Sequence, residues 1–169
     1  VDSSGNVYVG DAYNHMIRKI DSSGNVTTLA GSGSVGSTNG QGTAAKFYYP
    51  FGVAVDTSGN VYVADQNNHL IRKIDSSGNV TTLAGQAGVS GSNDGQGTAA
   101  RFNYPYGVAV DSSGYVYAAD RQNHLIRKID SSGNVKTLAG SAGVQGSTNG
   151  QGTSASFNYP RGVGVDSSG

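Results

Sequence analysis

One sequence of sixteen residues occurs three times in this chain. It reads Asp-x-x-Asn-His-x-Ile-Arg-Lys-Ile-Asp-Ser-Ser-Gly-Asn-Val and begins at Asp11, at Asp65 and at Asp120. The histidines of the three copies are 54 and 55 residues apart. A nearly constant period of this length indicates a tandem-repeat fold, in which each unit packs against its neighbours. Residues present in every copy are therefore expected to hold the scaffold together, and function is expected where the copies differ or in what the whole assembly forms.

Composition and charge narrow the classes of partner. The chain of 169 residues has 11 Lys and Arg against 11 Asp and Glu, so its formal net charge is zero. Binding to nucleic acid usually needs many phosphate contacts from a basic surface, so the charge balance argues against that partner. No apolar run approaches the length that crosses a membrane, and no membrane partner is expected. The chain has no cysteine, which excludes disulfides and thiolate metal sites.

The middle unit has the pattern of four short strands separated by turns. Apolar and β-branched residues form short runs, and Asp-Ser-Ser-Gly-Asn or a close variant separates several of them. In such a turn the Asp carboxylate accepts backbone N–H bonds and the Gly takes a positive φ angle, which predicts a hairpin. No window has a sustained helical period, so we expect almost no helix. The expected strands cover residues 52–56, 60–65, 69–75 and 80–84.

A long loop follows the fourth strand of each unit. In the middle unit it runs from Gly85 to Pro105, which is long for a compact domain. An aromatic residue recurs near the end of the loop and is expected to fix it to the sheet; it is Phe47, Phe102 or Phe157. The proline three residues later excludes a helix before the next first strand.

Four-stranded antiparallel units in tandem are typical of β-propeller blades, so the expected fold class is all-β. The segments 14–18, 68–72 and 123–127 read Asn-His-Leu-Ile-Arg, with Met in place of Leu at Met16. They resemble the NHL repeat, which is named after Asn-His-Leu, and the resemblance covers essentially the whole chain. It implies blades of a ring that commonly has six of them. It also implies a platform that binds protein or RNA, with some enzymes among the relatives.

The two ends of the chain predict how a ring could close. The units cover about 1–54, 55–109 and 110–164 of a single domain, and residues 162–169 read as a first strand without the rest of its blade. Val1 and Asp2 read as the end of a first strand whose beginning is missing. We expect a homodimer in which Gly162, Val163, Val165 and Asp166 of one chain complete the first blade of the other. The alternative is a fragment that aggregates through its open strand edges.

The recurring polar residues have both a chemical and a structural interpretation. Histidines around a ring could hold a metal, and an Asp–Arg pair could be a catalytic acid with its partner. Because they recur in every copy, we expect structural roles: the histidines at turns, and the Asp–Arg pairs as bidentate ion pairs between blades. We therefore expect no catalytic residue, no metal and no cofactor. The residues are His15, His69 and His124 with the pairs Asp11 and Arg18, Asp65 and Arg72, and Asp120 and Arg127.

The positions that differ between copies are the candidates for a ligand or partner surface. They lie after the second strand and after the proline, where loops of one rim or of the central channel are expected. Tyrosine and arginine among them are residue types that often dominate binding energy. Neutral drift at tolerant loops is the alternative. The candidates are Tyr13, Gln66, Asn67, Arg121, Gln122, Phe51, Tyr106 and Arg161.

These observations predict a non-enzymatic, self-assembling β-propeller scaffold whose partner is a second copy of itself. The alternative is a module that binds a glycan, a peptide or a protein through the variable loops. An enzyme of the lyase or lactonase kind would need His, Glu or Asp clustered at the axis, but the chain has no glutamate. RNA binding would need the series Lys19, Lys73 and Lys128 to form a basic face. The near-identity of the units is typical of recent amplification or of a chain built by design.

Overall fold

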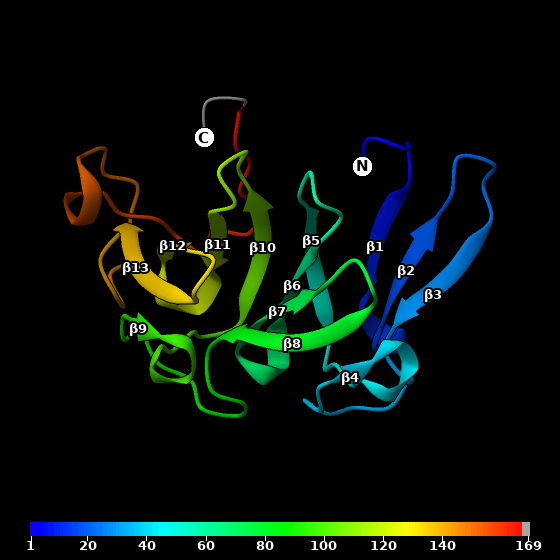
Figure 1. Cartoon of the computed structure of the whole chain (residues 1–169). Coiled ribbons are helices and arrows are strands. Elements are labelled where there is room, and N and C mark those ends of the chain that lie inside the picture. The colour runs from blue at the N-terminus through cyan, green and yellow to red at the C-terminus, as the bar shows by residue number, and fades with distance from the viewer. Residues whose placement is uncertain (167–169) are drawn as a thin grey trace.

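The computed structural model describes residues 1–166 of the chain. Residues 167–169, the last three of the expected strand 162–169, lie outside the described residues. The strands form three antiparallel sheets that follow one another side by side in chain order (Figure 1). The all-β expectation is confirmed, because the helical segments of the described chain are short 3-10 turns. These are Ala12–Asn14 (η1), Gly42–Ala44 (η2), Gln66–Asn68 (η3), Gly97–Ala99 (η4), Arg121–Asn123 (η5) and Gly152–Ser154 (η6).

The strands of each sheet follow the predicted meander. The first sheet contains β1 (Val7–Asp11), β2 (Met16–Ile20) and β3 (Val26–Ala30). The second contains β5 (Pro50–Val55), β6 (Val61–Asp65), β7 (Leu70–Ile74) and β8 (Asn79–Ala84). The third contains β10 (Pro105–Val110), β11 (Val116–Asp120), β12 (Leu125–Ile129) and β13 (Asn134–Ala139). The proline that ends each long loop is the first residue of β5 and of β10.

The second and third sheets each contain one strand that the sequence analysis did not predict. β4 (Gly40–Gln41) pairs with β8, and β9 (Gly95–Gln96) pairs with β13. Both come from the long loop that was expected only as a connection. β4 follows the first sheet in the chain but forms the outer edge of the second (Figure 1). Each loop therefore ties two neighbouring sheets together through backbone hydrogen bonds.

The predicted hairpin turns form as expected from their residue types. Asp56 shows the arrangement: its Oδ1 accepts the backbone N–H groups of Ser58 at 2.9 Å and of Asn60 at 2.8 Å. Gly59 lies between them with a φ of 81°, in the left-handed region that favours glycine. The equivalent aspartates at 2, 21, 75, 111 and 130 accept the same pair of backbone bonds.

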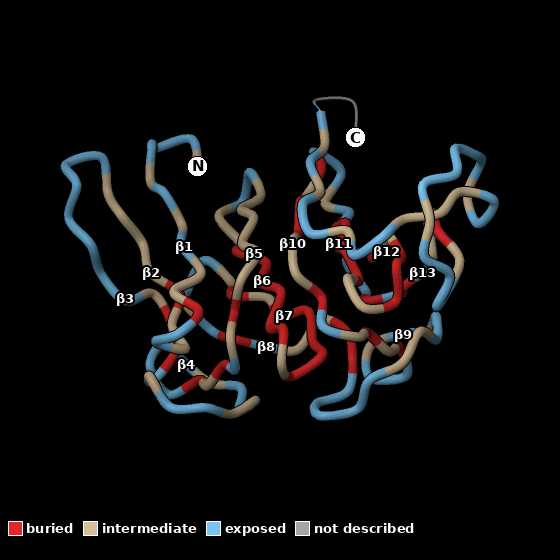
Figure 2. The backbone as a smooth tube through the Cα atoms, turned by 180° about the vertical axis from the view of Figure 1, so that it is seen from behind, coloured by how far each residue is buried: buried red, intermediate tan, exposed pale blue. Residues whose placement is uncertain are grey.

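The core lies between the sheets, and the middle sheet is buried on both faces. One face of β6 presents Val61 and Val63 to the first sheet, where they pack with Ile17. The other face presents Tyr62 and Ala64 to the third sheet. Figure 2 shows the buried backbone concentrated in the middle and third sheets, whereas the first sheet is mostly half-buried or exposed. No helix in the described part of the chain is long and apolar enough to span a membrane.

The innermost strands approach one another at glycine. A Cβ added to Gly52 would lie 2.5 Å from the carbonyl oxygen of Tyr106 on β10, which is too close for any larger residue. Gly107 of β10 makes the same approach to the carbonyl oxygen of Arg161. Residues 161–162 therefore stand beside β10 as β10 stands beside β5, in the place of a further first strand.

Candidate functional site

A buried polar network recurs at the junction between sheets. In the second sheet, Oδ2 of Asp65 accepts hydrogen bonds from Nη1 of Arg72 at 3.0 Å and from Nδ2 of Asn68 at 2.8 Å. Oδ1 of the same carboxylate accepts the backbone N–H of Tyr48 at 2.8 Å. The side chains of Asp65 and Arg72 are fully buried. The third sheet repeats this arrangement with Asp120 and Arg127.

The prediction of a bidentate Asp–Arg pair between blades was wrong. Asp65 and Arg72 belong to adjacent strands of one hairpin, and one nitrogen contacts one oxygen. The arginine crosses to the preceding loop through its other contacts. Nη2 of Arg72 donates to the Thr38 carbonyl at 3.2 Å and to Oδ1 of Asn39 at 2.7 Å. The arginine is therefore a clamp that fastens the incoming loop to the sheet.

Burial sets the protonation behaviour of these pairs. Burial raises the pKa of Asp65 to about 6, although Arg72 and Asn68 favour its charged form. It raises the pKa of Asp120 to about 6 in the same way. These carboxylates are enclosed by the scaffold and bonded on both oxygens, so they are unsuited to reach a substrate. Within residues 1–166, no group of three or more His, Cys, Asp or Glu side chains is close enough to share a metal ion.

The three histidines lie at equivalent turns and have the same hydrogen bond. Each follows a 3-10 turn with a left-handed backbone, at φ angles of 57°, 59° and 60°. Nδ1 of His69 accepts the backbone N–H of Tyr104 at 3.2 Å, and the two rings pack edge to face with centroids 4.6 Å apart. His15 and His124 repeat the contact with Tyr49 and Tyr159. Burial lowers the pKa of His69, which favours the neutral ring that this acceptor role requires.

Three of the variable residues come together along the inner edge of the sheets, Phe51 on β5, Tyr106 on β10 and Arg161 beside β10. The rings of Phe51 and Tyr106 stack with centroids 4.6 Å apart and an angle of 19° between their planes. The guanidinium carbon of Arg161 lies 5.7 Å from the centroid of Tyr106. We name Phe51, Tyr106 and Arg161 the inner ladder. Aromatic faces beside an arginine can hold a flat or an anionic group.

The other variable residues differ in how accessible they are. Tyr13 is 79% exposed, and its ring meets Tyr49 edge to face at 5.3 Å. The guanidinium of Arg121 lies over Tyr159 at 5.3 Å. Gln66, in contrast, is 9% exposed, which corrects its assignment to the surface. Asn67 and Gln122 are half-buried, and their backbone N–H groups bond the loop carbonyls of Tyr48 and Asn103.

Sequence reasoning missed the tyrosines that complete this rim. They precede the recurring proline, and the repeated Tyr-Pro sequence could have revealed them. The Tyr-Pro sequence also indicates the end of the loop, and this structural role alone does not predict an exposed tyrosine. Together with Tyr13 they form the aromatic rim, which we define as Tyr13, Tyr48, Tyr49, Tyr104 and Tyr159.

The residues predicted to join two copies lie in two separate regions, at the start of the first sheet and on the outer face of the third sheet. Asp2 completes the first hairpin turn and accepts the hydroxyl of Tyr8 at 2.9 Å, whereas Val1 is 81% exposed. Val163 and Val165 line a hollow of about 290 Å³ on the outer face of the third sheet. Tyr117, Ile126 and Leu138 form its other wall, and Gly164 and Asp166 complete the lining. Residues 161–166 belong to no strand in the described structure.

Comparisons with known proteins agree with this geometry. A family model described as NHL repeat matches residues 47–74, and one described as Teneurin NHL domain matches residues 89–157. Protein SUPPRESSOR OF QUENCHING 1 of Arabidopsis thaliana is 34% identical over 73% of this chain. NHL repeat-containing protein 2 of Gallus gallus is 38% identical over 58% of it. The chain spans only 12% and 13% of these two relatives.

Other matches differ in the activity that their names imply. A probable peptidyl-alpha-hydroxyglycine alpha-amidating lyase of Caenorhabditis elegans is 33% identical over 54% of this chain and matches 25% of its own length. A protein of unknown function from Bacteroides thetaiotaomicron has a TM-score of 0.76 and 27% identity, covering 95% of this chain and 39% of its own. An auxiliary nutrient binding protein from the same species has a TM-score of 0.75 at 21% identity, covering 98% and 41%. At 21% identity, the similarity to the auxiliary nutrient binding protein shows a shared fold only.

Proposed function

The chain belongs to the NHL-repeat family of β-propellers, and on that premise we propose that it is a non-enzymatic binding scaffold that closes its ring with a second copy of itself. Two copies with three blades each would form a ring of six. Each interface would join the open face of the first blade to the open face of the third blade of the other copy. The observation that carries the proposal is a difference in exposure. Residues at the same position of the repeat are buried in one sheet and exposed in another.

Equivalent valines are buried only where a neighbouring sheet is present. Val61 and Val63 of β6 face the first sheet and are 2% and 0% exposed. Their equivalents in β1, Val7 and Val9, are 39% and 37% exposed. Burying a valine side chain stabilises by about 1.5–3 kcal/mol. The valines of β6 gain this stability from contact with the first sheet. Because β1 has nearly the same sequence, its valines are expected to gain a similar amount from contact with a neighbouring sheet.

The inner strand edges are complementary. Among residues 1–166, β1 pairs with β2 alone, whereas its equivalent β6 also pairs with the first strand β5. Residues 161–166 have the sequence of a first strand, and residues 161 and 162 lie beside β10. The observed pairs Val53 with Val63 and Val55 with Val61 give the register. By equivalence, Val163 would pair with Val9 of the second copy, and Val165 with its Val7.

The outer edges and the arginine clamp match as well. Gly40 of β4 pairs with Val80 of β8, so Gly150 would pair with Val26 of β3 in the second copy. Val26 is 53% exposed, whereas Val80 is 1% exposed. Arg18 has only a 3.3 Å contact with Asp11 and is 31% exposed. In the ring it would reach Thr148 and Asn149, as Arg72 reaches Thr38 and Asn39.

The acidic residues support a role without catalysis. All eleven are aspartates, and ten of them have structural bonds within the described chain. Six cap hairpin turns, three pair with an arginine of their own hairpin, and Asp94 binds Arg127 at 2.8 Å. A carboxylate whose oxygens are occupied by the scaffold is poorly placed to act as a general acid or base.

Sedimentation velocity of two altered chains tests the scaffold proposal. Val9→Asp places a charge on a face that is exposed in the single copy, so it should leave the fold intact and halve the particle mass. Deletion of residues 162–169 should have the same effect by removing the first strand offered to the partner. Val144→Asp is the matched control, since Val144 is 50% exposed and its equivalent Val89 stays 40% exposed where the second and third sheets already meet. If Val9→Asp or the deletion keeps the mass of the parent, the proposed pairing through β1 and residues 162–169 is excluded.

The inner ladder and the aromatic rim favour a second candidate function, binding of a glycan, peptide or protein at this end of the blades. Aromatic and arginine side chains that remain accessible there are frequent binding hot spots. Screening on glycan and peptide arrays tests this function, with Tyr106→Ala and Arg161→Ala as the altered chains. A ligand whose signal is lost in both variants and kept in Val144→Asp would support it. Equal signals in all of these chains would contradict it.

A further inference from the structure

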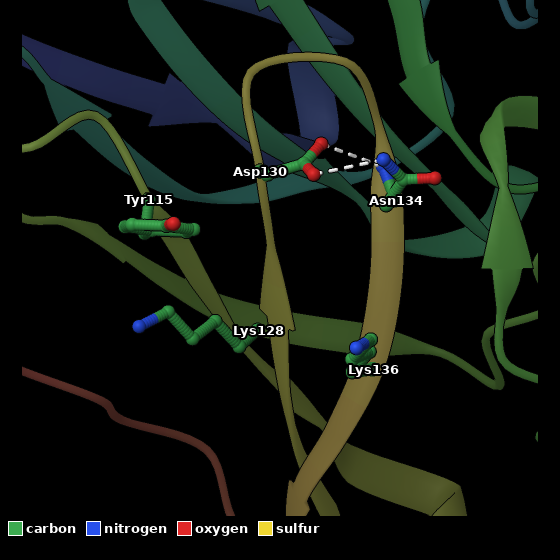
Figure 3. A pocket seen from close by; sticks show the side chains of 5 residues that line it. All are labelled: Tyr115, Lys128, Asp130, Asn134 and Lys136. Atoms are coloured by element: carbon green, nitrogen blue, oxygen red, sulfur yellow. Dashed lines mark hydrogen bonds between the residues drawn. The ribbon is translucent and has the colours of Figure 1, made fainter.

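The third sheet carries a hollow that the other two sheets lack the residues to form. It has a volume of about 260 Å³ and is lined by Tyr115, Lys128, Asp130, Asn134 and Lys136 (Figure 3). The residues come from β12, β13, the turn between these two strands and the turn before β11. Tyr115 and Lys136 are peculiar to this copy. The first two copies have Asn6 and Asn60 in place of Tyr115, and Thr27 and Thr81 in place of Lys136.

Lys136 places a second lysine opposite Lys128. Lys128 and Lys136 are directly opposite each other in the ladder of β12 and β13, so both side chains project from the same face. Like charges in this position repel and lower the stability of a strand pair. In the second sheet the same position pairs Lys73 with Thr81, which has no charge. An anion between the two lysines would turn this repulsion into an attraction.

Tyr115 lacks a hydrogen bond that asparagine makes at this position of the turn, and its ring contacts the Lys128 ammonium group instead. Asn60 donates from Nδ2 to its turn carboxylate, Asp56, at 2.8 Å, and a tyrosine has no such group. The ring of Tyr115 is instead 38% exposed, with Nζ of Lys128 at 3.9 Å from its centroid. This contact holds the ammonium group at the edge of the hollow. A hydrogen bond with Tyr117 raises the pKa of Lys128 above its ordinary value of 10.5.

The nearby carboxylates are already bonded. Asp130 accepts the backbone N–H groups of Ser132 and Asn134 and the side-chain amide of Asn134 (Figure 3). Asp111 accepts the hydroxyl of Tyr117 at 2.9 Å and two backbone N–H groups of its turn. Asp94, in the adjoining hollow, accepts Arg127 and the hydroxyl of Thr137. These aspartates reduce the local positive charge, but within residues 1–166 none of them forms an ion pair with Lys128 or Lys136.

A further blade next to the third sheet would leave the hollow open. The second sheet has such a neighbour on the same face, and there Thr81 stays exposed and Lys73 half-buried. Lys136 and Lys128 occupy these positions in the third sheet. The site is therefore independent of ring closure, and its test does not depend on the mass of the particle.

We propose that the hollow between Tyr115, Lys128 and Lys136 binds a small oxyanion group, a phosphate, a sulfate or a carboxylate. The two ammonium groups would donate to its oxygens. The amide nitrogen of Asn134 is held by Asp130, so the lysines carry the recognition. A group that is bound by charge in an open hollow is held loosely unless the rest of the ligand adds contacts, so the free ion should bind weakly.

The test is a titration of the intact 169-residue chain followed by amide resonances in NMR spectra. Inorganic phosphate should shift the resonances of residues near Lys128 and Lys136 in a saturable way, and parallel titrations with sulfate and acetate determine which oxyanion fits best. Lys136→Thr and Tyr115→Asn restore the residues of the other copies, so both variants should fold. Lys136→Thr should weaken binding about tenfold, as expected for losing one hydrogen bond to a charged group. Raising the sodium chloride concentration should weaken it further.

A gain-of-function variant tests the same proposal without relying on lost binding. The double variant Asn6→Tyr with Thr27→Lys rebuilds the hollow on the first sheet, beside Lys19. It should give a second set of saturable shifts around residues 6, 19 and 27. Shifts of equal size at all lysines, or unchanged affinity in Lys136→Thr, would overturn the proposal. So would a double variant that is folded by circular dichroism but shows no new shifts.

Discussion

Arg18 and Arg72 occupy the same position of the repeat but have different surroundings. Arg72 is fully buried and fastens the preceding loop, whereas Arg18 is 31% exposed and its side chain bonds Asp11 in the described structure. Removing one partner of a buried pair leaves an unpaired charge. We expect Arg72→Ala to lower the free energy of unfolding by about 3–5 kcal/mol. Urea denaturation measures this change.

The matched control is Arg18→Ala, made in the Val9→Asp chain so that a single copy is compared. Because Arg18 is partly exposed there, its loss should cost much less, about 0–1 kcal/mol. Equal losses at the two positions would contradict the role of Arg72 as a buried clamp.

His69→Ala tests the structural role of the recurring histidine. The change removes the Nδ1 acceptor of Tyr104 N–H and the packing of two rings. Leaving a partly buried N–H without its partner costs about 1–3 kcal/mol. Thermal unfolding should show this loss, with no change in bound metal by elemental analysis. Stoichiometric zinc in the parent chain that disappears in the variant would contradict the structural role.

The turn aspartates predict how stability depends on acid. Hydrogen bonds from Asn79 lower the pKa of Asp75 below its ordinary value of 3.8. A carboxyl with a lowered folded-state pKa contributes stability above its unfolded pKa, and this contribution is lost as the pH falls through the folded pKa. The difference in unfolding free energy between the parent and Asp75→Asn should therefore be constant near pH 7 and shrink below pH 3.8. A difference that grows in acid would contradict this linkage.

Residue-scale predictions from sequence were accurate where the cause is local. The Asp and Gly of each hairpin turn act within five residues of each other, so their pattern carries the whole mechanism. The arginine clamp could not be predicted in the same way. Arg72 bonds Asn39, which lies 33 residues away in the sequence, and its hairpin pairing with Asp65 was mistaken for a contact between blades.

At the scale of elements, the unpaired edge of β1 makes a sharp prediction about register. Val165 of one copy should lie opposite Val7 of the other, as Val55 lies opposite Val61. The parent has no cysteine, so in the double variant Val7→Cys with Val165→Cys no native thiol competes with the introduced pair, and the two single variants control for bonds between like positions. Mild oxidation should give a covalent dimer on a non-reducing gel.

The control for register is Val7→Cys with Gly164→Cys. Adjacent strand residues point to opposite faces, so this pair should cross-link poorly. If the control forms the dimer and the Val165 variant does not, the proposed register is wrong by one residue.

The longer strands could be predicted from the sequence, whereas the shortest ones could not. Strands of five or six residues were recognised from their apolar and β-branched runs. β4 and β9 have two residues each, Gly and Gln, and carry no apolar pattern. They form only because a neighbouring sheet offers a free edge, which no local sequence signal reports. The inner ladder has the same origin, since Phe51 and Tyr106 are 55 residues apart and meet through the stacking of sheets.

At the scale of the whole molecule, the exposed faces of the two outer sheets are the central feature. The first sheet exposes Val7, Val9 and Val26, and the third exposes Leu138 at 46%. In a closed ring of two copies these faces would meet in the way that the described sheets already meet. The inner ladder would then contain six side chains around the axis, with Arg161 of each copy next to Phe51 of the other.

The native mass of the unaltered chain tests this account most directly. Light scattering on a sizing column should give about 34 kDa, twice the 17.1 kDa of one chain, at all concentrations where the ring is populated. Such a mass, lost in Val9→Asp and kept in Val144→Asp, is the predicted result. A particle of 17.1 kDa that stays folded at high concentration would contradict the ring of two copies.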